Sequence, residues 1–193
     1  KILGETLDDA AGEAFDKVAR ILGLKYPGGP KISRCSELSK SDFHNSKVGL
    51  RRVRLPRPMI NTKDYNFSFS GLKTAVLYLV RDLAKKYSLR QIRPAIAKEF
   101  QDAVVEVLIK KTVRAAKEYK VKTILLGGGV AANKELRKQL VEKLRNELPE
   151  AMCWMPEATL AGDNALMIAM AAYFTGKKIA PTKIGADANL KLS

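Results

Sequence analysis

The chain has 193 residues, and its 46% hydrophobic content supplies enough apolar side chains for a buried core, which excludes a disordered polymer. Its 35 Lys and Arg against 20 Asp and Glu give a formal charge of +15, which favours a polyanionic partner such as RNA, DNA or an acidic membrane. No apolar run reaches the roughly 18 residues of a membrane span, and the N-terminus does not read as a signal peptide, so we expect a cytoplasmic protein.

The first third of the chain predicts one helix followed by irregular segments. Apolar residues at helical spacing predict a helix over residues 8–22 that ends at Gly23. The stretch "KYPGGPKI" then predicts a turn. Residues 38–59 show little periodicity, apart from an alternation of Val53 and Leu55 with arginines that is typical of a short extended segment. "NFSFSGLKT" is a second alternating stretch, which breaks at Gly71.

The rest of the chain mixes helices with short strands, and this order indicates a helix-rich α/β fold. Helices are predicted over residues 72–87 and from residue 89 to about 119. A strand over 121–126 leads through a glycine turn into a helix over about 132–147. "AMCWM" is a short strand candidate, and the apolar stretch "LAGDNALMIAMAAYFTG" predicts a last helix that ends at Gly176.

The turn of Gly127, Gly128 and Gly129 is the first candidate site. It lacks the G-K-[ST] ending of a phosphate-binding P-loop and does not fit G-x-G-x-x-G. Three adjacent glycines still let a flat group lie against bare backbone, and Asn133 offers a donor and an acceptor at the helix start, which suits an adenine or a ribose. The other interpretation is structural: the glycines turn a strand into a helix, and Asn133 caps it.

Acidic residues gather on the first predicted helix. Asp9, Glu13 and Asp16 fall at i, i+4 and i+7 on one face, where carboxylates can accept hydrogen bonds from sugar hydroxyls. For Asp8 and Asp9 we favour a simpler interpretation, which is negative charge near the N-terminus of that helix. Asp16 stands beyond the first turn, beside Phe15, and is the stronger candidate for a ligand contact.

Metal ligands are scarce in the sequence. Asp163, in the "GDN" that opens the last helix, is either its N-cap or one ligand of a metal whose other ligands lie elsewhere. Cys35 and Cys153 have no metal-ligand spacing and His44 is the only histidine, so the sequence does not predict a zinc site made by this chain. We interpret both cysteines as core or surface filling.

Three further segments have two interpretations each. The turns "PGGP" at 27–30 and "FSFSGLK" at 67–73 either touch a ligand or are purely structural. The arginines between Arg51 and Arg57 form either a ribbon that contacts phosphates or a solvated basic face.

Four phrases together carry a family resemblance: "GETLDDAAGEAFDKVARILGLKYPGGP", "RPM" followed by "FSFSGLKTAV", "GGGVAANKELR" and "GDNALMIA". In this order and spacing they resemble the TsaD family of tRNA adenosine threonylcarbamoyltransferases, formerly named O-sialoglycoprotein endopeptidases. The resemblance covers the chain from about Ile2 into the last apolar helix. It implies an actin-like ATPase fold, as in sugar kinases and heat-shock proteins, with two lobes and a nucleotide in the cleft between them.

The resemblance also implies roles for particular residues. The family's adenylate contacts correspond here to Asp16, Gly29 and Asn133, and its metal-binding aspartate, for iron or zinc, corresponds to Asp163. Further contacts in the cleft are expected from Glu13, Gly28, Gly128 and Gly129. No catalytic residue is assigned. The glycine turn would then lie on the adenosine side of the cleft rather than form its phosphate clamp.

The sequence departs from the family in lacking its H-x-x-x-H metal ligands and its S-G-G phosphate loop, and it begins with Lys1 where a natural start would show Met. We therefore expect residues 1–193 to form a single domain, which is most of the helix-rich C-terminal lobe. As a free fragment it is expected to be inactive, because one carboxylate makes a weak metal site and no phosphate clamp remains.

For the complete enzyme the resemblance implies transfer of a threonylcarbamoyl group from threonylcarbamoyl-adenylate to N6 of the adenosine beside a tRNA anticodon. The implied partners are tRNA, a paralogous partner subunit and a small ATPase, without a membrane, and a homodimer is left open. Two other interpretations remain: a module that binds adenine nucleotide or tRNA without catalysis, and the peptidase of the older family name, for which the sequence offers too few metal ligands and no general base.

Overall fold

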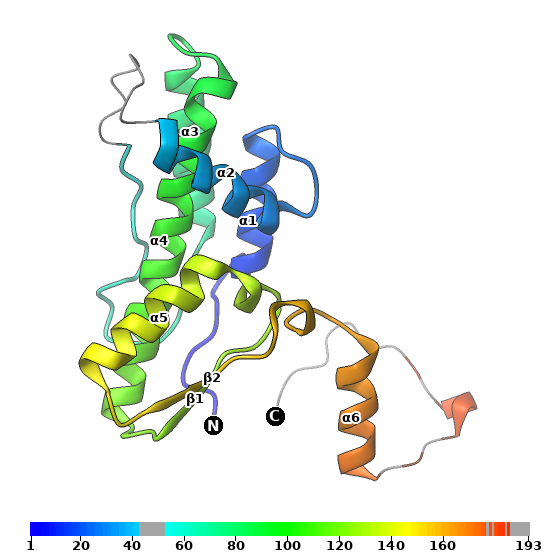
Figure 1. Cartoon of the computed structure of the whole chain (residues 1–193). Helices are drawn as coiled ribbons and strands as arrows, with labels where there is room; N and C mark the ends of the chain where they lie inside the picture. The colour runs from blue at the N-terminus through cyan, green and yellow to red at the C-terminus, as the bar shows by residue number, and fades with distance from the viewer. Residues whose placement is uncertain (43–52, 177, 179, 184, 186–193) are drawn as a thin grey trace. The chain divides into compact units, whose positions relative to one another are not determined.

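The computed structural model describes residues 1–42, 53–176, 178, 180–183 and 185, and among them no helix is both long and apolar enough to span a membrane. The chain divides into two compact units, Lys1–Gly162 and Asp163–Ser193. Figure 1 shows the elements of each. A single domain over residues 1–193, as part of a larger lobe, stays a prediction.

The first unit begins with helix α1 (Ala11–Ile21) and helix α2 (Gly28–Asp42). Helix α1 ends as expected, because Gly23 takes a left-handed φ of 67°. The turn predicted over "KYPGGPKI" is shorter than expected, since α2 starts inside it at Gly28. Gly and Pro both interrupt helix interiors, but both occur in the first turn of a helix. Proline is tolerated there because the N–H that it lacks would have no helical partner.

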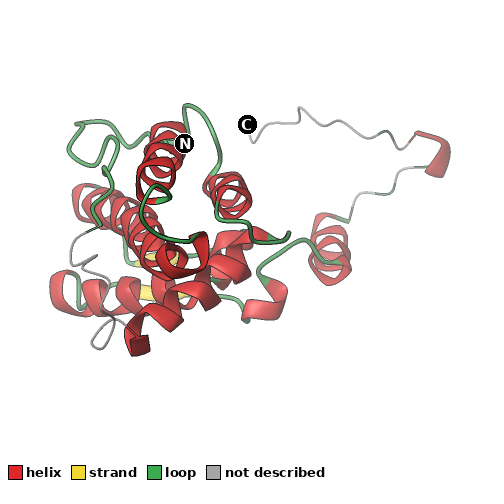
Figure 2. Ribbon diagram, turned by 90° about the horizontal axis from the view of Figure 1, so that it is seen from above, coloured by secondary structure: helices red, strands yellow, loops and turns green. Residues whose placement is uncertain are grey.

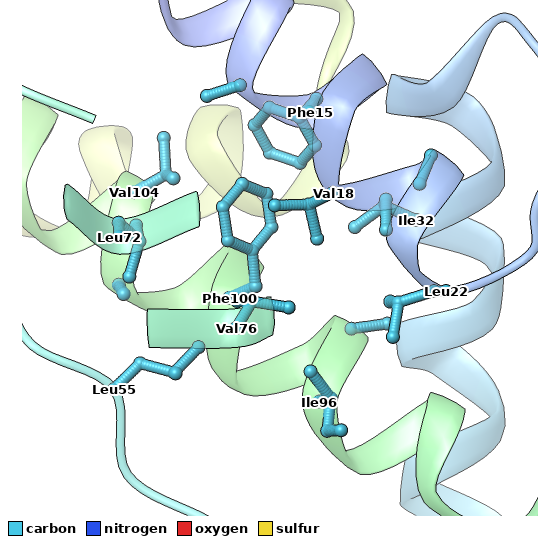
Figure 3. Packing of buried hydrophobic residues seen from close by; sticks show 14 of the residues in the cluster. Phe15, Val18, Leu22, Ile32, Leu55, Leu72, Val76, Ile96, Phe100 and Val104 are labelled. Atoms are coloured by element: carbon cyan, nitrogen blue, oxygen red, sulfur yellow. The ribbon is translucent and has the colours of Figure 1, made fainter. Parts of the chain in front are cut away.

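Helix α4 (Leu89–Glu118) is the longest element, and α2, α3 (Ser70–Leu83) and α5 (Lys134–Glu147) all pack against it. Figure 3 shows the core that α1 to α4 share, where the rings of Phe15 and Phe100 meet edge to face with centroids 5.1 Å apart. A second buried cluster joins α4 to α5. Its buried members are Val105, Ile109, Val113, Ala116, Leu136, Leu140, Leu144 and Leu148.

The sheet consists of β1 (Thr123–Leu125) and β2 (Met152–Trp154), the strands drawn in yellow in Figure 2. They pair in parallel, with Ile124 opposite Cys153, and these two side chains pack against the second cluster. The helix α5 lies between the strands in sequence and makes the crossover that parallel pairing requires. The helix-rich α/β class with a small parallel sheet is therefore confirmed.

The segments expected to be extended are mostly loops. Residues 53–57 form no strand, and the backbone N–H of Leu55 donates instead to a carboxylate oxygen of Glu99 at 2.9 Å. The second alternating stretch contributes a single parallel bridge between Thr6 and Phe67, after which α3 starts at Ser70.

The second unit holds helix α6 (Ala165–Thr175), which ends at Gly176 in the left-handed conformation, as the sequence predicts. Its N-cap is Asn164, whose side chain accepts a hydrogen bond from the N–H of Met167. The N-cap interpretation of Asp163 is therefore wrong by one residue. Three short 3-10 turns complete the described elements of the two units. The first unit holds η1 (Gly129–Ala132) and η2 (Ala158–Leu160), and the second holds η3 (Pro181–Lys183).

Candidate functional site

A pocket of about 630 Å³ opens in the first unit between α1, the start of α2 and the turn that leads into α5. Its size suits a ligand of several hundred daltons. It is lined by Gly12, Phe15, Asp16, Pro27, Gly29, Pro30, Ser33, Arg34, Glu37, Gly129, Val130, Ala132, Asn133 and Lys134. The structure thus brings together Asp16, Gly29 and Asn133, which lie far apart in the sequence.

Asp16 joins α1 to α2 at the edge of the pocket. Its Oδ1 accepts a hydrogen bond of 2.6 Å from the N–H of Gly28, the first residue of α2. Gly28 is required by close approach, because a Cβ there would stand 2.6 Å from Cα of Asp16 and 2.7 Å from Cβ of Ala19. This carboxylate therefore satisfies an N–H at the start of α2 while it lines the pocket.

Glycine occupies the positions of this site for different structural reasons. Gly128 has φ of 82°, a conformation that favours glycine, and it precedes the 3-10 turn at Gly129. Gly29 has no such constraint, and a Cβ built on it would meet no atom within 4 Å. Gly29 and Gly129 both line the pocket, so each presents bare backbone to whatever occupies it.

Asn133 has one of the two roles that the sequence left open, the helix cap, and its ligand contact stays a prediction. Its Oδ1 accepts the N–H of Leu136 at 3.0 Å and so caps α5, which confirms the capping interpretation. Its Nδ2 donates to Ser33 Oγ at 3.0 Å and to Gln101 Oε1 at 2.9 Å. Asn133 also lines the pocket. Its side chain is thus held from three directions.

Sequence reasoning missed Ser33 and Gln101. Ser33 lies on a helix that was not predicted. Gln101 did carry a signal, because it interrupts the apolar face of α4 four residues after Ala97 and three before Val104, and a polar residue on a buried face needs hydrogen-bond partners. Gln101 is only 5% exposed.

Three of the expected cleft residues are not among those that line this pocket. Gly28 packs against α1, and Gly128 sets the turn before Gly129. Glu13 forms an exposed ion pair with Lys17 at 2.7 Å.

Asp8 binds at a helix start, but the helix is α3 rather than α1. Asp8 accepts hydrogen bonds from the N–H groups of Phe69 and Ser70 and from the hydroxyls of Ser68 and Ser70. Desolvation alone would raise the pKa of Asp8, but these hydrogen bonds outweigh it and lower the pKa to about 2.

Asp9 pairs with two lysines instead, with Lys17 at 2.6 Å and Lys73 at 3.8 Å. The "FSFSGLK" turn, which contains Lys73, is therefore tied to the N-terminal segment by both aspartates.

Asp163 lies in the second unit, so the structure does not place it relative to the pocket. In the described part of the chain, no three His, Cys, Asp or Glu side chains gather in a way that could hold a metal ion. The residues present therefore do not make a complete metal site. His44 lies outside the described residues.

Cys35 agrees with the interpretation as core filling, and of the described arginines Arg54 is exposed, whereas Arg57 is held in ion pairs. Cys35 is in the core, and burial raises the pKa of its thiol, as it does for Cys153. Arg57 pairs with Glu99 and with Glu106 on α4, so it fastens a loop. Arg51 and Arg52 lie outside the described residues.

The fold and the pocket define a helix-rich α/β unit that presents a glycine-walled pocket at the starts of two helices. The family model described as "TsaD: tRNA N6-adenosine threonylcarbamoyltransferase" matches residues 1–170. The chain is 53% identical over 178 residues to the tRNA N6-adenosine threonylcarbamoyltransferase of Thermosipho africanus, covering 92% of this chain and 50% of that one.

Two further relatives carry the same name. The protein of Thermosipho melanesiensis is 46% identical over 100% of this chain and 54% of its own, and that of Listeria welshimeri is 44% identical over 92% and 49%. The chain therefore belongs to the TsaD family of transferases, as its sequence phrases predict. It spans about half the length of the curated relatives that it matches.

Proposed function

We propose that this chain forms the adenylate-binding side of a tRNA N6-adenosine threonylcarbamoyltransferase, within the helix-rich lobe of an actin-like ATPase fold. The observation that carries the proposal is the meeting of Asp16, Gly29 and Asn133 at one pocket, because these are the positions that the family resemblance assigns to the adenylate. The length of the relatives supports a complete enzyme about twice as long as this chain.

The pocket offers each part of an adenylate a suitable partner. Asp16 keeps its second carboxylate oxygen for a ribose hydroxyl while the first holds Gly28. The bare backbone at Gly29 and Gly129 lets a flat base approach closely. Arg34 and Lys134 are exposed where they line the pocket, so their charged groups can meet a phosphate.

In the complete enzyme, N6 of the tRNA adenosine attacks the threonylcarbamoyl carbon of the bound adenylate. A C–N bond forms, N6 loses a proton, and the bond from that carbon to the phosphate oxygen breaks to release AMP. This chain would hold the adenylate, which becomes the leaving group. Binding the reacting group in a fixed geometry is the contribution that such a pocket makes.

The metal of the complete enzyme, iron or zinc by family resemblance, would take Asp163 as one ligand. Since the described residues complete no such site, we derive no step through it. The charge of +15 supports tRNA as the partner, which would place the enzyme in the cytoplasm. A paralogous subunit and a small ATPase are proposed as further partners.

A second candidate is a module that binds adenine nucleotide without catalysis. It is favoured by the lining of the pocket, all of which comes from the first unit, whereas Asp163 belongs to the second. The isolated chain is accordingly proposed to bind nucleotide while lacking transfer activity.

The test uses two matched glycines, each the second residue of a helix and each with no atom within 4 Å of an added Cβ. Gly29→Leu places a side chain at the pocket, whereas Gly71→Leu places one outside it. Calorimetric titration with ATP and with a threonylcarbamoyl-adenylate analogue should show binding by the wild-type chain, weakened roughly tenfold or more by Gly29→Leu and unchanged by Gly71→Leu. Equal binding by both variants would place the ligand elsewhere.

A further inference from the structure

Three side chains form a hydrogen-bonded wall at the pocket: Ser33 and Asn133, which line it, and Gln101, which does not. Ser33 Oγ donates to Gln101 Oε1 at 2.6 Å, and Asn133 Nδ2 donates to both of these oxygens. Behind them, Gln101 Nε2 donates to Ser36 Oγ at 3.0 Å, and Ser36 donates to the backbone oxygen of Ser33. The wall joins α2, α4 and the start of α5.

The donors of this wall are already used. Both N–H bonds of the Asn133 amide are taken, and the Ser33 hydroxyl has given its only proton to Gln101. The Asn133 Oδ1 accepts one bond from Leu136 N–H, which leaves it one lone pair, and the Ser33 oxygen also keeps one. Since Ser33 and Asn133 line the pocket, these two side chains offer a ligand acceptors only.

Gln101 fixes this arrangement without lining the pocket. Its Oε1 receives the two donors that would otherwise be free, one from Ser33 and one from Asn133. Gln101 also lines a small polar cavity of about 60 Å³, which shares Ser33 and Lys134 with the main pocket and is large enough for one or two waters. Gln101 is 5% exposed, so its amide has no alternative partner in bulk water.

We infer that Gln101 is a positioning residue for base selection: it holds Ser33 and Asn133 as acceptors, so that the pocket takes a purine with a 6-amino group and rejects one with a 6-oxo group. The inference rests on the proposed adenylate pocket and adds how it selects its base. A 6-oxo group would set its lone pairs against those of the wall, and an acceptor buried against acceptors loses its hydrogen bonds to water without replacement.

The test compares the affinities of ATP and ITP by calorimetric titration. ATP carries a 6-amino group on its purine, and ITP carries a 6-oxo group. The wild-type chain should bind ATP more tightly than ITP by roughly tenfold or more. In Gln101→Leu, the freed N–H of Asn133 can turn to the ligand and donate to a carbonyl, so the preference should fall to about threefold or less. Gln91→Leu, on the same helix but in contact only with Ser88 among the bonds described for it, should keep the wild-type preference.

Ser33→Ala is the second variant, because it removes a single hydroxyl of the wall and is the milder change if Gln101→Leu unfolds. It should also lower the preference for ATP, and circular dichroism checks that each variant is folded. A purely structural role for Gln101 would weaken ATP and ITP binding equally and leave their ratio unchanged, which would overturn the inference.

Two other outcomes separate the inference from the proposal on which it rests. Equal binding of ATP and ITP by the wild-type chain would overturn base selection and leave a nucleotide pocket in place. Binding of neither nucleotide by the folded wild-type chain would overturn the pocket itself, and with it the inference.

Discussion

Helices α5 and α6 start in the same way and end up in opposite surroundings. Each is capped by an asparagine whose Oδ1 accepts the N–H three residues later, at 3.0 Å for Asn133 and 2.9 Å for Asn164. Helix α5 then buries Leu136, Leu140 and Leu144, whereas α6 has no buried residue. The cap therefore determines where a helix begins and says nothing about what covers it.

The difference lies in how apolar residues are distributed around each helix. The three buried leucines of α5 recur every four residues, and the rest of the helix is mostly charged, so one stripe meets α4. Helix α6 is apolar on all sides, a composition typical of a helix that is enclosed on all sides. Within the described residues of its own unit nothing encloses it: Ile168 is 63% exposed and Phe174 is 77% exposed.

The largest effect that tests this comparison comes from truncating one apolar side chain in each helix. Leu140→Ala should lower the free energy of unfolding by about 3 kcal/mol, because it removes buried methyl groups and leaves a cavity. Ile168→Ala should change it by less than about 0.5 kcal/mol. Urea unfolding followed by circular dichroism measures both. A comparable loss in the two variants would mean that α6 is buried in solution.

The sequence predicts those elements whose pattern lies within a few neighbouring residues, and it misses those that depend on distant residues. The helices α1, α4 and α6 and both strands follow from periodicity and terminal glycines within a few residues. Helix α2 was missed because its first residues are glycine and proline, and the bond that satisfies Gly28 comes from Asp16, twelve residues earlier. The partner of Asp8 was assigned to the wrong helix for the same reason, since α3 starts about 60 residues away.

The pocket shows the same limit. A local pattern gave two interpretations for Asn133, as cap or as ligand contact, and the structure supports the cap while it places the residue at the pocket. No local pattern pairs Asn133 with Ser33, which is 100 residues away. Gln101 could have been noticed on its apolar helix face, but its partners depend on how three helices pack.

The second prediction separates the two asparagine caps. Asn133→Ala should lower the free energy of unfolding by about 2 kcal/mol, because it loses the cap and also the hydrogen bonds to Ser33 and buried Gln101. Asn164→Ala should leave the main unfolding transition within about 0.5 kcal/mol, since α6 buries no side chain. Urea unfolding gives both values.

Asn133→Asp sharpens this second test. Aspartate keeps an acceptor for the N–H of Leu136 but cannot donate to Ser33 or Gln101. If the cap alone mattered, the aspartate variant would be as stable as the wild type. Stability close to that of Asn133→Ala would instead assign most of the effect to the wall of the pocket.

The smallest predicted effect concerns α3, a helix whose N-terminus is held by a residue outside it. The pKa of Asp8 is lowered in the folded state to about 2, below its ordinary value of 3.8. Its contribution to stability is therefore complete above about pH 5, falls as the pH drops, and is lost below about pH 2. Asp8→Asn should cost about 1 kcal/mol at pH 7, a modest value because the residue is exposed.

The difference between wild type and Asp8→Asn should then shrink as the pH falls from 5 to 2 in urea unfolding experiments, because the protonated wild type loses the same negative charge. Asp82→Asn, at the other end of α3 and paired with Lys85, is the control. Pairing with Lys85 also lowers the pKa of Asp82, so its loss should follow the same direction with pH, but it should be smaller than that of Asp8→Asn, because Asp82 is exposed and sits near the negative end of the helix dipole. An unchanged gap for Asp8→Asn at low pH would mean that shape and hydrogen bonds, rather than charge, hold the start of α3.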